Sequence, residues 1–273
     1  MPPSSDSLAE SPVKSPGEAP LDLPSAATER ARAKLAAGGR PYVTLKAAAT
    51  LDGKIAMADG ESRWITGEAA RALAHDLRAR HDGVLVGIGT VLRDDPALTV
   101  RLEGMNARPA RIVLDSTCRI TREARVLAGD GAARIVVAGE GAPPAAVEAL
   151  RGAGVTVFVA DTPRPRPAAF LPWLREQGLE TLLVEGGGQV HGEFIANSEA
   201  DELFLFLAGR LIGDAEAPAW CGPLGLKSLS ETPRLKLSPP RRVGEDILVH
   251  GTFGGRPAEA PAETPKNPRT GGR

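Results

Sequence analysis

Short runs of apolar, largely β-branched residues alternate along most of this chain with segments of helical composition. The apolar runs show little polar alternation, which is typical of strands buried on both faces of a sheet. We expect strands at 42–49, 83–87, 111–115, 135–139, 155–160, 181–185, 202–208 and 247–253. We expect helices at 68–80, 144–152, 168–176 and 189–196, with Thr66 as the cap of the first.

This alternation favours a mostly parallel sheet with helices on both faces, because parallel strands need a crossover connection that is usually a helix. The last apolar segments, 204–207, 235–237 and 247–250, have no helix between them, so an antiparallel edge is expected. Residues 40–253 have the length of one domain. The prediction is a single three-layer α/β/α sandwich with a mixed, mostly parallel central sheet.

The two ends of the chain differ in composition from this core. Residues 1–39 are rich in Pro, Ser, Ala and Glu and offer few large apolar side chains. Such a segment cannot offset the entropy of ordering itself, so we expect disorder with a short helix over 26–37. Residues 254–273 are again rich in Pro and Gly, and a disordered tail is expected.

The composition of the chain bears on its binding partners and on its location in the cell. The 273 residues carry a formal net charge of −1, so no surface for nucleic acid or an anionic membrane is predicted. No apolar run approaches the roughly 20 residues that span a bilayer. The N-terminus lacks the order of a signal peptide. Only Cys118 and Cys221 are present, without a CxxC motif, which favours reduced thiols. We expect a cytoplasmic protein.

Two glycine turns follow expected strands. Residues 185–188 (EGGG) join a strand to a helix, where backbone N–H groups and the helix N-terminus favour an anion. The pattern is neither GxGxxG nor a P-loop, and a tight structural turn is the alternative. Residues 87–90 (GIGT) repeat the pattern, with packing alone as the alternative. Together they indicate an enzyme that binds a phosphorylated cofactor or substrate.

Charged residues accompany these turns. Lys46 lies inside an expected strand, where a charge needs either a partner or a solvated edge. Asp94 and Asp95 follow the second turn and form either a solvated turn or an acceptor for a ribose. Residues 191–193 (HGE) match half of a zinc-deaminase motif, but no P-C-x-x-C completes it, so no metal site is predicted.

Several stretches carry a more specific signal. They are 42–56 (YVTLKAAATLDGKIA), 60–66 (GESRWIT), 90–101 (TVLRDDPALTVR), 111–116 (RIVLDS) and 184–187 (VEGG). Together they closely resemble the reductase half of the bacterial bifunctional riboflavin-biosynthesis deaminase/reductase. The similarity spans about residues 40–253. Members of that family usually carry a deaminase domain before the reductase, whereas a Pro-rich segment precedes residue 40 here. A stand-alone reductase is therefore expected, with a separate deaminase elsewhere.

The resemblance implies a dihydrofolate-reductase-like fold, a homodimer and NADPH as hydride donor. It implies reduction of the ribosyl group of 5-amino-6-(5-phosphoribosylamino)uracil to a ribitylamino chain. The cofactor contacts that it implies are Ala48, Trp64, Thr90, Asp94, Ser116, Gly187, Gly188, Gln189, Val190, His191, Gly192 and Glu193. The substrate contacts that it implies are Ser62, Arg78, Leu98, Arg101 and Glu185.

The nicotinamide would supply the hydride, so the protein would orient the reactants and manage protons. We hypothesise that Lys46 and Glu185 assist ring opening and protonation at the ribose, with Asp95 as a further helper. Arginine suits a ribose phosphate because its fork donates two hydrogen bonds. Asp115 after a strand would suggest NAD in a Rossmann fold, but the implied fold is different.

Other functions remain compatible with these residues. One is the same reduction of the undeaminated 2,5-diamino-6-(5-phosphoribosylamino)pyrimidinone, the order used in fungi and archaea. Another is a related pterin or folate reductase. A third, of a different class, is a non-catalytic nucleotide-binding protein of the same fold. The joint presence of Lys46, Asp94 and Glu185 speaks against the third.

Overall fold

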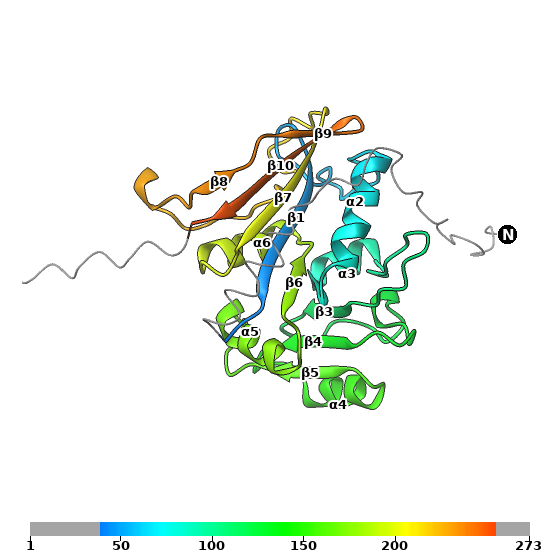
Figure 1. Cartoon of the computed structure of the whole chain (residues 1–273). Helices are drawn as coiled ribbons and strands as arrows, with labels where there is room; N and C mark the ends of the chain where they lie inside the picture. The colour runs from blue at the N-terminus through cyan, green and yellow to red at the C-terminus, as the bar shows by residue number, and fades with distance from the viewer. Residues whose placement is uncertain (1–38, 255–273) are drawn as a thin grey trace, which may run out of the picture.

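A computed structural model describes residues 39–254 and shows strands alternating with helices (Figure 1). The strands are β1 (Tyr42–Thr50), β2 (Gly83–Gly87), β3 (Ala110–Leu114), β4 (Arg134–Ala138), β5 (Thr156–Val159), β6 (Thr181–Val184), β7 (Glu202–Ala208), β8 (Leu235–Leu237), β9 (Arg241–Val243) and β10 (Asp246–Phe253). The helices are α2 (Glu68–Ala79), α3 (Ile88–Asp94), α4 (Pro144–Gly152), α5 (Pro167–Glu176) and α6 (Gly188–Ala196). The expectations for 1–38 and 255–273 lie outside the described residues.

All these strands belong to one ten-stranded sheet. Its order is β5-β4-β3-β2-β6-β1-β7-β10-β8, and β9 pairs with β10. Strands β1 to β7 run parallel, whereas β10 is antiparallel to β7, β8 and β9. The mixed sheet with an antiparallel edge is therefore confirmed. Within residues 39–254, no helix is long and apolar enough to cross a bilayer.

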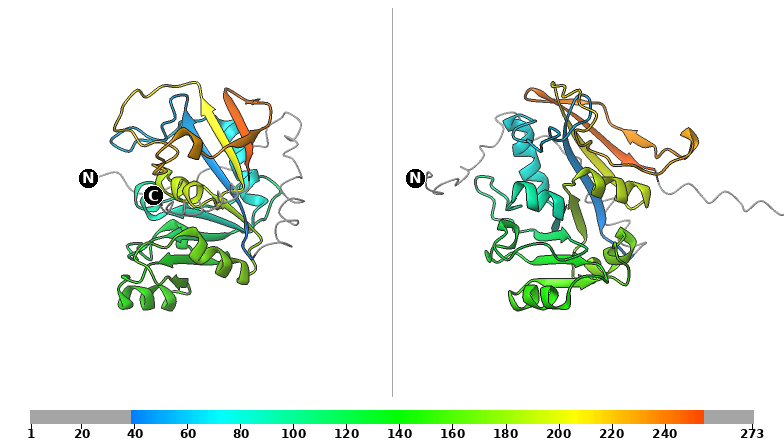
Figure 2. Two further views of the ribbon diagram at one scale, coloured as in Figure 1. Left: turned by 90° about the vertical axis from the view of Figure 1, so that its left-hand side faces the viewer. Right: turned by 180° about the vertical axis from the view of Figure 1, so that it is seen from behind.

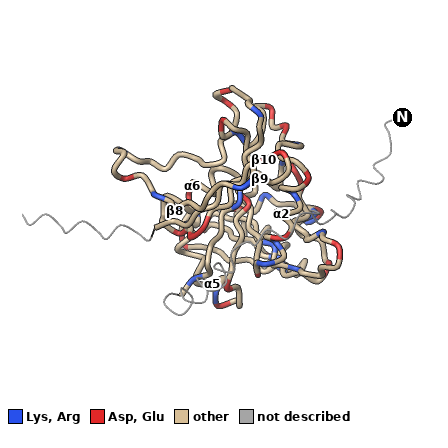
Figure 3. Tube along the Cα trace, turned by 45° about the horizontal axis from the view of Figure 1, so that its top comes forward, with Lys and Arg blue, Asp and Glu red and all other residues tan. Residues whose placement is uncertain are grey.

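Helices cover both faces of the sheet (Figure 2). One apolar cluster joins α2, α3 and α4 to strand residues such as Val84, Val113 and Phe206. A second cluster joins α5 and α6 to strand residues such as Leu45 and Leu85 on the opposite face. Each fully buried Val, Leu or Phe side chain contributes roughly 1.5–3 kcal/mol. The two clusters make the fold three-layered, as predicted. Positions of basic and acidic residues are distributed along the whole described trace (Figure 3).

The strand register determines which polar side chains share a face. Leu45 on β1 lies beside Val184 on β6 in a parallel pair, and both belong to the cluster under α5 and α6. Because side chains alternate along a strand, the next residues, Lys46 and Glu185, point to the opposite face, towards α2. Both therefore lie on the α2 side of the sheet, Glu185 directly after the end of β6 and Lys46 in the middle of β1.

Two local expectations were wrong. Thr66 does not cap α2, because Gly67 occupies the cap position and no side chain there makes a cap hydrogen bond. The Gly67 N–H instead donates to Oδ2 of Asp246, at 2.8 Å, from the distant strand β10. Residues 88–90, expected as part of a glycine turn, form the first residues of α3.

Candidate active site

The two glycine turns meet at the carboxyl edge of the parallel strands. The N–H of Gly87, at the end of β2, donates to the carbonyl oxygen of Gly186, after β6, at 2.8 Å. A Cβ built on Gly187 would lie 3.7 Å from Oγ1 of Thr90 in α3. The two turns, far apart in the sequence, therefore lie side by side in the structure. Ligands of open parallel sheets bind at this edge.

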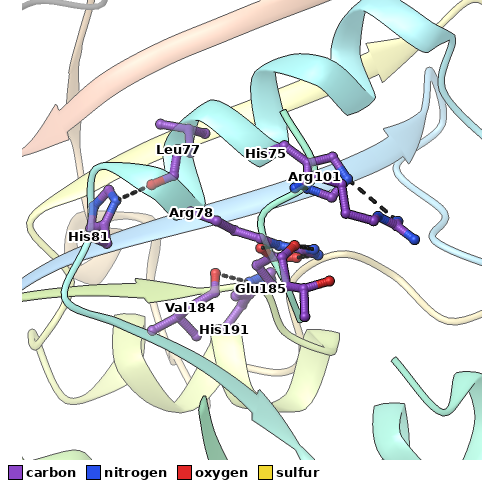
Figure 4. A network of polar contacts seen from close by, with 9 residues as sticks. His75, Leu77, Arg78, His81, Arg101, Val184, Glu185 and His191 are labelled. Atoms are coloured by element: carbon purple, nitrogen blue, oxygen red, sulfur yellow. Dashed lines mark hydrogen bonds and ion pairs between the residues drawn. The ribbon is translucent and has the colours of Figure 1, made fainter. Parts of the chain in front are cut away.

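A charged cluster lies beside these turns, between α2 and the sheet (Figure 4). Arg78 of α2 forms a bidentate pair with Glu185: Nε lies 2.5 Å from Oε1 and Nη2 lies 2.7 Å from Oε2. The side chains are 15% and 8% exposed. Nη1 of Arg78 donates to the carbonyl oxygen of Thr99 at 3.0 Å. Lys46 lies close enough to interact electrostatically with both Glu185 and Arg78, and its Nζ is 5.9 Å from the centroid of the Phe206 ring.

Burial and neighbouring charges shift the pKa values of Glu185 and Lys46 in this cluster. Burial alone would raise the pKa of Glu185, but the charge and hydrogen bonds of Arg78, with the charge of Lys46, hold that pKa at about 2. Burial lowers the pKa of Lys46, while Glu185 opposes and Arg78 adds to that shift. Glu185 is therefore a permanent carboxylate. Burial makes the Lys46 ammonium a stronger acid than an exposed lysine, so Lys46 is the candidate proton donor of the pair.

The predicted substrate contacts occupy different environments. Each nitrogen of the Arg78 guanidinium already has an internal acceptor, so only its two remaining N–H bonds are available to a ligand. The backbone of Arg101 is held by His75 of α2. Leu98 is buried, and Ser62 donates to Oδ1 of Asp94 at 3.3 Å.

Predicted cofactor contacts outside the 187–193 turn lie on several elements. Ala48 is two residues beyond Lys46 on the same face of β1. Trp64 is 53% exposed, and the guanidinium of Arg71 lies 4.5 Å from the centroid of its ring. Ser116 follows β3, and its carbonyl oxygen accepts from the N–H of Gly139 at 2.9 Å.

Asp95 makes its contact outside the Lys46–Glu185–Arg78 cluster. It is exposed, adopts a left-handed conformation with φ 39° at the end of α3, and accepts from the N–H of Arg125 at 2.8 Å. That contact ties α3 to the 125–127 turn, so the geometry gives Asp95 a structural role. A part in proton transfer stays a prediction for this residue.

Much of the 187–193 turn packs inward. A Cβ on Gly188 would lie 2.1 Å from the carbonyl oxygen of Ala219, and one on Gly192 would lie 3.1 Å from that of Gly222. The buried ring of His191 lies between two carbonyl oxygens, that of Val184 at 3.2 Å and that of Trp220 at 2.8 Å. These three residues fasten α6 to the chain around residue 220. Gln189 and Glu193 are exposed, and Val190 packs beside Gly87.

The segment that packs against α6 is bound by side chains that directly follow β1. Residues 209–222, which we term the strap, follow β7. Asp52 accepts backbone N–H groups of Ile212 at 3.2 Å and Gly213 at 2.7 Å. Lys54 donates to the carbonyl oxygen of Ala217 at 2.8 Å. The Thr50 hydroxyl and the strap amides hold the pKa of Asp52 at about 2. Residues of the L-D-G-K sequence thus bind the strap, which packs against α6.

His75 was missed in the sequence. Its ring is 5% exposed, and it lies one helical turn before Arg78 on the same face of α2. That spacing was the only signal available. Burial first, and the charge of Arg78 second, lower the pKa of His75 to about 4, so the ring is neutral near pH 7. Among the described residues no group of His, Cys, Asp and Glu could hold a metal ion.

The comparisons with known proteins agree on one family. Residues 41–249 match the family model described as the RibD C-terminal domain. The riboflavin biosynthesis protein RibD of Bacillus amyloliquefaciens is 39% identical over 211 residues, which is 77% of this chain and 57% of that protein. The chain therefore spans a little over half the length of that relative.

A stand-alone relative matches equally well. The 2,5-diamino-6-ribosylamino-4(3H)-pyrimidinone 5′-phosphate reductase of Methanothermobacter thermautotrophicus is 38% identical over 218 residues, which is 79% of this chain and 100% of that protein. A solved structure of Acinetobacter baumannii RibD superposes with a TM-score of 0.72 at 30% identity, covering 84% of this chain and 62% of that one. The likeness confirms the expected dihydrofolate-reductase-like fold.

Proposed function

The chain belongs to the RibD C-terminal domain family, and from that premise we propose that it is a nicotinamide-dependent oxidoreductase of riboflavin biosynthesis. Its reaction is the reduction of the ribosyl group of 5-amino-6-(5-phosphoribosylamino)uracil to a ribitylamino chain. The observation that carries the proposal is the buried Lys46–Glu185–Arg78 cluster beside two converging glycine turns. A protein that only bound a nucleotide would need no such cluster of buried charge.

The chemistry requires one proton and one hydride. The bond between C1′ and the ribose ring oxygen breaks and the oxygen takes up a proton, which leaves a protonated imine between C1′ and the exocyclic nitrogen, with its N–H in place. Hydride then adds to C1′, and the electron pair of the C=N double bond returns to the nitrogen to give the neutral secondary amine. NADPH, when bound, supplies the hydride.

Lys46 is the proton donor in this proposal, because burial lowers the pKa of its ammonium group. Glu185 cannot donate, since its pKa is held at about 2. Its negative charge opposes the effect of burial on the pKa of Lys46, and the carboxylate can accept a hydrogen bond from a ribose hydroxyl. The two residues, which were expected together to assist ring opening and protonation, therefore have different roles in this proposal.

The end of β3 supports NADPH over NADH. Asp115 is fully buried, and its Oδ2 accepts the N–H of Ile120 at 2.8 Å, so this acid is committed inside the protein and is not available to a ribose hydroxyl. Arg119 pairs with Oδ1 of Asp115 through Nε at 3.4 Å, and its side chain is 56% exposed, so its outer guanidinium nitrogens can meet a 2′-phosphate. Arg119→Ala should lower kcat/KM with NADPH about tenfold and leave the value with NADH within twofold. Equal losses with both cofactors would contradict the assignment.

The undeaminated pyrimidinone is the second candidate substrate. It is favoured by the full-length match to the stand-alone archaeal reductase. The test is to follow loss of NADPH absorbance with the aminouracil, the diaminopyrimidinone and dihydrofolate in turn. Turnover of either phosphoribosylamino compound supports the reductase, and the faster one identifies the substrate. Turnover of dihydrofolate alone, or of none, would refute the proposal.

Two variants test the role of Lys46 in that assay. Lys46→Met keeps the length of the side chain but removes the amine, and kcat should fall by at least about 100-fold. Lys236→Met removes an exposed amine on β8 and should leave kcat unchanged. A Lys46→Met enzyme that folds and turns over like the wild type would remove this residue from the mechanism.

A homodimer is also proposed. Leu237 on β8 and Ile247 on β10 are 61% and 44% exposed, and these outer strands offer an apolar surface to a second copy. Light scattering of the purified protein should report twice the chain mass of 28.4 kDa. A monomer at micromolar concentration would contradict this. A cytoplasmic location and a separate deaminase stay predictions.

A further inference from the structure

Helix α2 contacts the segment around Val100 through two side chains one turn apart (Figure 4). Nη1 of Arg78 donates to the carbonyl oxygen of Thr99 at 3.0 Å, and Nδ1 of His75 accepts from the N–H of Arg101 at 3.3 Å. The Thr99 carbonyl group and the Arg101 N–H group both point towards α2. In a parallel sheet, a carbonyl and an N–H two residues apart bind one neighbouring strand in the same way. The two side chains thus hold this irregular segment as an adjacent strand would.

The surroundings of His75 require a neutral ring. The side chain is buried, the cations Arg78 and Arg101 lie against it, and Lys46 is close enough to act on it. Glu185 is the opposing charge, and it is already paired with Arg78. The Thr99 carbonyl also favours the protonated ring, but burial outweighs it and lowers the pKa of His75 to about 4.

The hydrogen bond then selects one tautomer. Because Nδ1 accepts the Arg101 N–H, the single ring proton of neutral His75 resides on Nε2. Nη2 of Arg101 lies 3.5 Å from Nε2, and both groups are donors. The ring therefore fixes the Arg101 backbone without accepting a hydrogen bond from the guanidinium at Nε2.

We propose that His75 is a positioning residue for substrate binding: its neutral Nδ1 holds the backbone of Arg101 so that the guanidinium meets the 5′-phosphate of the substrate. This inference rests on the proposed function. The proposal gives different roles to Arg78 and Arg101, which were both expected from the sequence to contact the substrate. Arg78 orders Glu185 and the Thr99 carbonyl inside the protein, whereas Arg101 recognises the phosphate.

Three variants at position 75 form a matched set. Asn places an acceptor oxygen near the position of Nδ1, Gln places one near Nε2, and Leu fills similar volume without an acceptor. His75→Leu should raise KM for the phosphorylated substrate about tenfold, the loss expected for one buried hydrogen bond, with kcat and NADPH affinity within about twofold. His75→Asn should restore KM to within about threefold, and His75→Gln should not. Equal KM values for the Leu and Asn variants would overturn the proposal.

A second comparison tests whether His75 acts through Arg101. In an Arg101→Ala background, His75→Leu should raise KM no further, because the two substitutions remove one interaction. With a substrate that lacks the 5′-phosphate, His75→Leu should also have no effect on KM. Additive effects in the double variant, or an unchanged penalty on the dephosphorylated substrate, would show that His75 acts elsewhere.

A measurement on the wild-type protein that does not depend on enzyme activity tests the proposal even if the variants fail to fold. Nitrogen-15 NMR of the wild-type imidazoles, with His75 assigned by its absence in His75→Asn, should show the Nε2–H tautomer, neutral from pH 8 down to about 5. A ring with its proton on Nδ1, or one that titrates with an ordinary histidine pKa, would refute the proposal. Lack of turnover by the wild type would remove the proposed function, whereas the tautomer would still be measured.

Discussion

Replacing Glu185 by Gln removes the titrating member of the buried pair with Arg78. The pKa of Glu185 is lowered from 4.5 to about 2 in the folded protein. A depressed folded-state pKa contributes stability that is present above the unfolded value and is lost as pH falls through the folded value. The difference, 4.5 minus 2, corresponds to about 3 kcal/mol. The Glu185 side chain is only 8% exposed, so solvent screens this contribution weakly.

The assay is urea unfolding followed by tryptophan fluorescence between pH 7 and pH 3. Between pH 4.5 and pH 3, the free energy of unfolding of the wild type should fall by about 2 kcal/mol more than that of Glu185→Gln. Glu148→Gln is the matched control, because that carboxylate is 70% exposed and its profile should parallel the wild type.

A complementary variant removes the cation. Arg78→Met leaves the carboxylate of Glu185 buried beside Lys46 alone and should lower the free energy of unfolding at pH 7 by about 3–5 kcal/mol. Parallel profiles for the wild type and Glu185→Gln, combined with a stable Arg78→Met, would refute the reasoning. Glu185 would then not be held as a permanent carboxylate, and Lys46 would lose its assigned partner.

Three substitutions test the packing around the strap. Gly188→Ala places a Cβ 2.1 Å from the carbonyl oxygen of Ala219, so limited proteolysis should cut the strap faster, whereas Gly89→Ala, which meets nothing within 4 Å, should not change that rate. Asp52→Asn weakens the acceptor of the strap amides and should speed their hydrogen exchange; unchanged protection would argue against the L-D-G-K fastening. His191→Leu removes the donor between two buried carbonyl groups and should lower the free energy of unfolding by about 1–3 kcal/mol in urea.

The elements of the fold were largely predictable, because each depends on local composition. β2 and β7 begin and end where their apolar runs do. The cap of α2 was not predictable, because the carboxylate that receives the Gly67 N–H comes from Asp246, far along the chain. α3 was missed because Gly87 and Gly89 read as a turn, although residues 88–94 are helical.

The candidate site was predictable as a set of residues but not as a set of roles. Lys46 stood out as a charge inside an expected strand and Glu185 as the acid of a glycine turn, and the structure brings them together on one face. Arg78 was expected to contact the substrate, yet its guanidinium is engaged by Glu185 and Thr99. His75 carried no motif at all, and only its packing against Arg101 marks it.

The order of apolar runs and glycines along the chain was enough to specify layers of helix and parallel sheet, since burial and backbone freedom are properties of short segments. Charge state is different in kind. The ionised state of Glu185, the lowered pKa of Lys46 and the neutral state of His75 depend on burial and on neighbouring charges that come from β1, α2 and the end of β6. Strand pairing brings β1 and β6 together, and the packing of α2 on the sheet excludes the water that would otherwise screen these charges.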